Sequence, residues 1–318
     1  MIVDERIIGH YTGQEDGPLV IAIGAIHGNE PAGVTALAEV FRLLEIEKQT
    51  IPDFIFKGQL VGLIGNLAAY KTGQRFIKND LNRIWDPETV EGLIKKVPDE
   101  LEFEDKELVG LLLKIRYLIT RSRAKNLIII DLHTTSADGG IFSIPLEDDP
   151  QSVQLAVDLH APVVLGLLKG LGGTLMHYAS GNHFLFQGLP EQVCCVAFEA
   201  GQHFDPLSVS RSISAVISTL RAAGCVKPED VDHKHDDILL AYAADLPKLT
   251  SITHVHHIGP EEHFTMRPGY VNFQKIHKGE QLAVSHNGPI YSPSDGLILM
   301  PLYQPKGTDG FFIVEPVF

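Results

Sequence analysis

The first residues whose types could do chemistry are His27 and Glu30, which lie on a short turn after an apolar run. Residues 19–24, Leu-Val-Ile-Ala-Ile-Gly, are apolar and rich in β-branched side chains, which predicts a buried strand. A helical pattern begins after Pro31, so both side chains belong to a turn between a strand and a helix. In open α/β sheets, ligands collect at the carboxyl ends of the strands. The turn therefore predicts half of a ligand site.

Two further apolar runs end in side chains of the same kind. The run Leu-Ile-Ile-Ile-Asp-Leu ends in His133, and the run Val-Cys-Cys-Val-Ala-Phe ends in Glu199. Two histidines and one glutamate form a ligand set of catalytic zinc sites, which leave the fourth position open. The sheet can bring His133 alongside His27 and Glu30, so we predict that these three residues bind Zn²⁺.

The elements that must position these side chains follow from periodicity. Short apolar runs predict strands, and apolar residues at helical spacing predict helices. The expected strands cover residues 2–10, 18–26, 58–66, 127–133 and 193–199, and the expected helices cover residues 33–47, 105–123 and 208–223. The polar stretch from Lys71 to about Asp105 predicts a long functional loop.

The composition and hydrophobic pattern of the chain change after Pro228. Residues 230–237 have the composition of a linker or a surface segment. From about residue 251, short alternating runs are separated by Gly and Pro, which is typical of β-hairpins. We predict two domains, residues 1–228 and 229–318. The predicted fold is a mixed β-sheet flanked by helices, followed by a small all-β domain.

Composition excludes several classes of partner. The 318 residues contain 26 Lys and Arg against 40 Asp and Glu, a net charge of −14, so nucleic acid and anionic membranes are not expected partners. No apolar stretch approaches the roughly 20 residues of a membrane helix, and the amino terminus lacks the layout of a signal peptide. The three cysteines make no disulfide framework and are expected to be buried. We expect a cytoplasmic protein, and a homo-oligomer is compatible with the sequence.

Four motifs in order carry a resemblance to a known family. They are His-Gly-Asn-Glu, Asp-Leu-Asn-Arg, Asp-Leu-His-Thr-Thr and Phe-Glu-Ala-Gly, spread over roughly residues 18–225. In this order they resemble the succinylglutamate desuccinylase/aspartoacylase family, a branch of the zinc carboxypeptidase-like fold. The resemblance implies that His27, Glu30 and His133 bind zinc, that Glu199 and Arg75 are catalytic, and that Asn82 and Arg83 hold a substrate carboxylate.

These roles agree with general chemistry. A glutamate beside a metal-activated water can take its proton and later deliver one to the leaving amine. A guanidinium such as that of Arg75 stabilises a developing oxyanion, and the fork of Arg83 suits a carboxylate. Asp131 shares a strand face with His133, where it either orients that ligand or makes a structural hydrogen bond.

The expected reaction is hydrolysis of the amide bond of a small N-acylated substrate that carries a carboxylate. The alternative within enzymes is a carboxypeptidase that acts on peptides, and a binding protein without turnover is a third reading. No arginine lies between Arg123 and Arg211, where aspartoacylases have one for a second carboxylate. N-acetylaspartate and succinylglutamate are therefore not the expected substrates.

Other polar residues have ordinary explanations as well as functional ones. Arg83 could pair with Asp80 at the surface, and Asn82 could serve a turn. Additional candidates are a second metal site at His254 and His256, a pocket wall from Tyr291 and Tyr303, and pocket histidines at positions 177, 183 and 203. For the histidines we favour solvated or structural roles.

Overall fold

A large mixed sheet forms the centre of the computed structural model, which describes residues 5–122, 124–180, 192–230 and 234–317. Within these residues, eleven strands are hydrogen-bonded in the order β1-β3-β2-β4-β7-β5-β6-β8-β14-β13-β10. Their bounds are β1 Ile7–Thr12, β2 Glu15–Gly24, β3 Lys57–Ile64, β4 Asn126–Thr135, β5 Phe142–Pro145, β6 Val163–Leu165, β7 Gln192–Gln202, β8 Leu249–His257, β10 Gln274–Ile276, β13 Gly296–Leu299 and β14 Asp309–Pro316.

The four strands β3, β2, β4 and β7 are parallel neighbours, and they place the site. Each of β2, β4 and β7 is buried along most of its length, which explains why its sequence is a continuous apolar run rather than an alternation. Because the strands are parallel, their carboxyl ends meet at one edge of the sheet. In the pairing of β4 with β7, His133 lies opposite Glu199.

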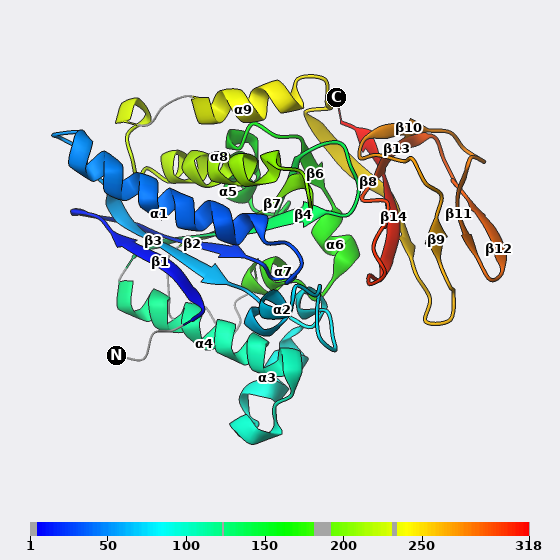
Figure 1. Cartoon of the computed structure of the whole chain (residues 1–318), viewed down its shortest axis with the longest axis horizontal. Coiled ribbons are helices and arrows are strands. Elements are labelled where there is room, and N and C mark those ends of the chain that lie inside the picture. Colours follow the sequence, from blue (N-terminus) through cyan, green and yellow to red (C-terminus); the bar gives the residue numbers. More distant parts are fainter. Residues whose placement is uncertain (1–4, 123, 181–191, 231–233, 318) are drawn as a thin grey trace.

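Helices cover both faces of this sheet (Figure 1). Figure 1 shows α1, α5, α8 and α9 above the sheet and α2, α3, α4 and α7 below it. The helix bounds are α1 Ala32–Thr50, α2 Leu67–Thr72, α3 Pro87–Ile94, α4 Phe103–Ser122, α5 Pro150–Asp158, α6 Leu167–Leu171, α7 Leu175–Ser180, α8 Leu207–Ala222 and α9 Lys234–Ala243. Two apolar cores result, one for each face.

The last part of the chain contributes to two sheets. Strands β8, β14, β13 and β10 extend the large sheet, while β9 (Thr265–Met266), β11 (Gln281–Ser285) and β12 (Gly288–Tyr291) form a separate three-stranded sheet. The predicted class, a mixed sheet flanked by helices with a small β-sheet unit at the carboxyl-terminal end, is confirmed. The domain division at residue 228 stays a prediction.

Three local expectations differ from the structure. Residues 5 and 6 of the expected first strand form a turn and β1 begins at Ile7, while residues 2–4 lie outside the described residues. The long polar stretch contains a helix, α3, which Asp86 caps by accepting a hydrogen bond from the Thr89 backbone at 2.8 Å. The expected linker at 230–237 runs into α9, whose buried Leu239 packs in the core on the α1 face. In both helices a few apolar contacts with the fold outweigh a polar local sequence.

The cysteine side chains lie in the protein interior. Cys194, Cys195 and Cys225 are free and buried, as expected. Burial raises the pKa of the Cys225 thiol to about 12. Among the residues that the structure describes, no helix is both long and apolar enough to cross a membrane.

Candidate metal centre

The turn after β2 is built so that two side chains point to the same place. Ala25 has a φ of 54°, which turns the chain sharply as the strand ends. Gly28 packs against the backbone of α2, where a Cβ atom would lie 2.1 Å from the carbonyl carbon of Ala69. Only glycine fits this contact, so the glycine of the His-Gly-Asn-Glu motif allows the turn to seat on α2 and leaves His27 and Glu30 facing the sheet edge.

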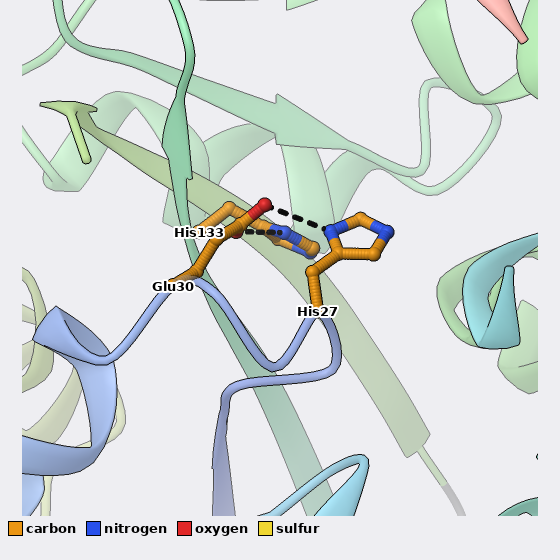
Figure 2. Close-up of side chains that lie close together, drawn as sticks. All are labelled: His27, Glu30 and His133. Carbon is orange, nitrogen blue, oxygen red and sulfur yellow. Dashed lines mark hydrogen bonds and ion pairs between the residues drawn. The ribbon is translucent and has the colours of Figure 1, made fainter. Parts of the chain in front are cut away.

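The structure brings His27, Glu30 and His133 together, as Figure 2 shows. One potential ligand atom from each residue lies within 4.8 Å of the others, and all three side chains are buried. Glu30 lies between the two rings, with Oε1 3.0 Å from His27 Nδ1 and Oε2 3.1 Å from His133 Nδ1. No other group of three such residues in the described part of the chain meets this distance.

The far side of each imidazole is held by a carboxylate. Asp80 Oδ1 lies 3.1 Å from His27 Nε2, and Asp131 Oδ2 lies 2.9 Å from His133 Nε2. A neutral His133 that donates from Nε2 to Asp131 presents a lone pair at Nδ1 toward Glu30. His27 also turns its Nδ1 toward Glu30, and its Nε2 faces both Asp80 and the Nη2 of Arg75, which lies 2.9 Å away. Asp80 therefore belongs to this site and is not a surface partner of Arg83, and Asp131 orients His133.

The electrostatics of this cluster favour a cation. Burial by itself raises the pKa of Glu30, but His27 and His133 outweigh burial and hold that pKa well below 4.5. Burial lowers the pKa of His133, and the adjacent Asp131 and Glu30 raise it well above 6.5. The site holds the buried carboxyls of Glu30, Asp80, Asp131 and Glu199 with Arg75 as the adjacent guanidinium. The donor set of two imidazole nitrogens and one carboxylate fits a divalent metal of the zinc type.

Arg75 lies at the edge of the cluster on the loop before α3. Its guanidinium donates to Glu30 Oε1 at 3.3 Å and to Asp80 Oδ2 at 3.1 Å. The loop itself is held from below by Glu104, a buried residue in the first turn of α4. The Glu104 carboxylate accepts hydrogen bonds from three successive backbone amides, those of residues 77, 78 and 79, at 2.6, 3.0 and 3.1 Å. Sequence reasoning did not identify Glu104, because its partners lie 25 to 27 residues away and leave no local pattern.

Glu199 faces the same edge from β7. It is buried, and its Oε2 has no hydrogen-bond partner among the described residues. Burial raises the pKa of Glu199 to about 8, His133 and Arg75 lower it, and Glu30 and Asp131 add to the rise. An unpartnered carboxyl oxygen next to the cluster is placed to receive a proton from a molecule bound there.

A cavity of about 70 Å³ opens beside these residues and continues toward β14. Glu199, Arg75, Asn82 and Arg83 line it together with the His-Glu-His cluster, so all seven residues expected at the site border one cavity. The rest of the wall is mostly apolar. It includes Ile144, Leu167, Leu168, Met176, Met300 and Phe312.

The two expected carboxylate-binding residues have partners already. Asn82 is buried and accepts a hydrogen bond at its Oδ1 from the Leu175 backbone at 3.1 Å. Arg83 donates from Nη2 to Asp309 Oδ2 at 2.8 Å, across 226 residues of sequence. Asp309 also lines the cavity, and nothing in the sequence around it had marked it as a site residue.

The remaining candidates within the described residues do not line this cavity. His177 borders a different pocket with Glu147 and Lys169, and His203 contacts Thr134 Oγ1 at 2.7 Å. Tyr303 lines a second pocket, which Arg75 also borders. Tyr291 lies on β12 and is 54% exposed. His254 and His256 belong to no three-residue metal cluster within the described residues. His183 lies outside those residues.

A family model matches this chain over residues 16–185, and its description is succinylglutamate desuccinylase/aspartoacylase catalytic domain. The match spans more than half of the chain and contains the whole His-Glu-His cluster. The chain belongs to this family.

Individual relatives agree with this assignment. A "probable aspartoacylase" from Nostoc sp. is 26% identical over 140 residues, which are 44% of this chain and 43% of that protein, so the chain matches less than half of this relative's length. The fold is that of solved structures at 16–18% identity. The product-bound ectoine utilization protein EutE (DoeB) from Ruegeria pomeroyi has a TM-score of 0.63, with 96% of this chain and 87% of that chain covered.

Two further structures carry the family's name in their descriptions. The succinylglutamate desuccinylase/aspartoacylase from Rhodobacter sphaeroides has a TM-score of 0.64 at 18% identity, covering 96% of this chain and 86% of its own. The succinylglutamate desuccinylase from Chromobacterium violaceum has a TM-score of 0.62 at 16% identity, covering 99% and 95%. Desuccinylases and aspartoacylases remove an acyl group from an amide, so the family is one of deacylases.

Proposed function

We propose that this family member is a zinc-dependent deacylase that hydrolyses the amide bond of an N-acyl amino acid or a related small amide. The observation that supports the proposal most strongly is the joint placement of the His27, Glu30 and His133 cluster and the unpartnered Glu199 at one cavity. The family assignment supports the reaction class.

The metal ligands would be His27 Nδ1, His133 Nδ1 and the Glu30 carboxylate. Asp80 and Asp131 fix the two imidazoles in the orientation that presents these atoms. When bound, zinc supplies Lewis acidity, which polarises a carbonyl oxygen and lowers the pKa of water.

The chain's own groups would move the protons and stabilise the developing charge. Glu199 takes the proton of the attacking water at its free Oε2 and returns a proton to the nitrogen of the leaving amine. Arg75, held between Glu30 and Asp80, donates N–H groups to the carbonyl oxygen as it becomes an oxyanion. Glu104 keeps the Arg75 loop in place through its three backbone amide contacts.

Asn82 and Arg83 line the same cavity, which is the basis for proposing that they contact the substrate's carboxylate. The apolar wall formed by residues such as Leu167 and Phe312 suits the aliphatic part of a small substrate. We therefore propose a small N-acylated substrate whose carboxylate lies at Asn82 and Arg83.

Metal content and hydrolysis, measured on the same preparation, test this function. We expect about one zinc per chain and chelator-sensitive release of a free amino acid from a panel of N-acyl amino acids, and Glu199→Gln should retain zinc while losing at least about 100-fold in kcat. Hydrolysis of peptides alone would instead favour a carboxypeptidase. Unchanged turnover in Glu199→Gln would refute the proposed role of this residue.

A further inference from the structure

The cavity has an unusual charge arrangement where β14 contributes to its lining. Arg83 and Asp309 both line it, their nearest atoms are 2.8 Å apart, and their side chains are only 19% and 9% exposed. The other guanidinium in the lining, that of Arg75, is engaged by Glu30 and Asp80. The β14 side of the described cavity therefore carries one positive and one negative charge, side by side.

This arrangement does not match an anionic substrate. A substrate with a single carboxylate would bring it to Arg83 against the repulsion of Asp309, which already uses part of the guanidinium charge. A second carboxylate would find no further Lys or Arg, because Arg75 and Arg83 are the only two among the described residues that line the cavity. Lys169 pairs with Glu147 and Asp148 and does not line the cavity.

We propose that the substrate is zwitterionic, with a carboxylate bound by Arg83 and a positively charged ammonium group bound by Asp309. This inference rests on the proposed deacylase function and specifies its substrate class. The substrate would be an N-acylated diamino acid or a similar molecule, in which one amine is acylated and a second amine remains free and protonated.

Both side chains have capacity left for such a ligand. Arg83 has five N–H donors and uses Nη1 for the Asn82 carbonyl at 2.9 Å and Nη2 for Asp309, while its Nε has no partner among the described residues. The Asp309 carboxylate accepts from Arg83, from His257 Nδ1 at 2.8 Å and from Thr308 Oγ1 at 3.2 Å. A carboxylate has about four acceptor positions, so one remains for an ammonium group.

A purely structural role for the pair makes a different prediction. Asp309 begins β14, and Arg83 is the last residue of the short 3₁₀ helix Leu81–Arg83, so the contact also connects these two regions. Loss of a structural tie would change the turnover of every substrate by the same factor. Loss of an ammonium-binding carboxylate would change only the turnover of substrates that carry the ammonium group.

Matched substrates separate these two roles. Nα-acetyl-L-lysine and Nε-acetyl-L-lysine each carry a carboxylate and an ammonium group, whereas Nα-acetyl-L-norleucine keeps the carboxylate and lacks the ammonium group. We expect kcat/KM for at least one lysine isomer to exceed that for the norleucine compound about 10- to 100-fold, and Asp309→Asn to bring this ratio close to one. Asp309→Glu, which keeps the charge, should retain the preference.

The control variant is Asp53→Asn, on the exposed loop between α1 and β3, which should leave the ratio unchanged. Equal or faster hydrolysis of the norleucine compound than of both lysine isomers would overturn this inference and leave the deacylase function standing. A ratio that Asp309→Asn does not alter would also overturn it. Absence of hydrolysis across the whole panel, with metal bound, would refute the deacylase function itself.

Discussion

Replacing Glu104 with glutamine should destabilise the protein and loosen the loop that carries Arg75. Glu104 is 1% exposed. Its carboxylate accepts four hydrogen bonds, three from the backbone amides of residues 77–79 and one from Asn66 Nδ2 at 3.3 Å. Burial raises the pKa of Glu104, but these donors outweigh burial and lower it below 4.5. Glutamine has the same shape but offers one carbonyl oxygen and an NH₂ group.

The magnitude follows from what the NH₂ group would face. If it replaces Oε2, it meets the amides of residues 78 and 79, both of which are donors. A hydrogen bond to a charged group contributes about 1.5–3 kcal/mol, so two lost acceptor contacts reduce the free energy of unfolding by about 3 kcal/mol. For 318 residues at about 2.1 cal/mol/K each, this corresponds to a decrease in Tm of about 4–5 °C.

Urea and thermal unfolding of the purified variant give this value directly, and hydrolysis assays on the same samples report the position of Arg75. Glu102 provides a matched control, because it lies two residues earlier and makes only an exposed ion pair with Lys78 at 3.1 Å. Glu102→Gln should change the unfolding free energy by less than about 0.5 kcal/mol. If Glu104→Gln unfolds at the same urea concentration as the parent protein, the reasoning about the buried carboxylate is wrong.

Two more predictions concern the cluster. Asp131→Asn should weaken metal binding about 10- to 100-fold, because an amide no longer fixes the proton on His133 Nε2. Competition with a chelator would measure this change in affinity. An unaltered metal affinity would contradict the assigned orientation of His133. The rate should rise with pH through the pKa of Glu199, since only the ionised carboxylate accepts a proton. That pKa is raised to about 8 by burial and a bound cation lowers it, so the rise should fall between pH 4.5 and 8; a kcat/KM that decreases over this range would exclude Glu199 as the base.

The sequence by itself determined which strands carry the site residues and at which end of those strands they lie. The apolar runs before His27, His133 and Glu199 are strong enough to specify buried strands, and parallel strands necessarily end at the same edge of a sheet. Local signals of this kind depend on neighbours within a few residues, which is why the positions of β2, β4 and β7 and the fold class follow from the chain alone.

Only the tertiary structure decided which charges face one another. Asp80 supports His27 across 53 residues, Glu104 holds the Arg75 loop across about 26, and Asp309 meets Arg83 across 226. An isolated Asp or Glu in a polar segment has the same local pattern whether it is solvated or buried against a distant partner. The partner is fixed by where β14 pairs within the sheet and by how α4 packs against the sheet. The charges that line the cavity beside β14, and with them the proposed substrate class, are therefore set only once the chain has folded.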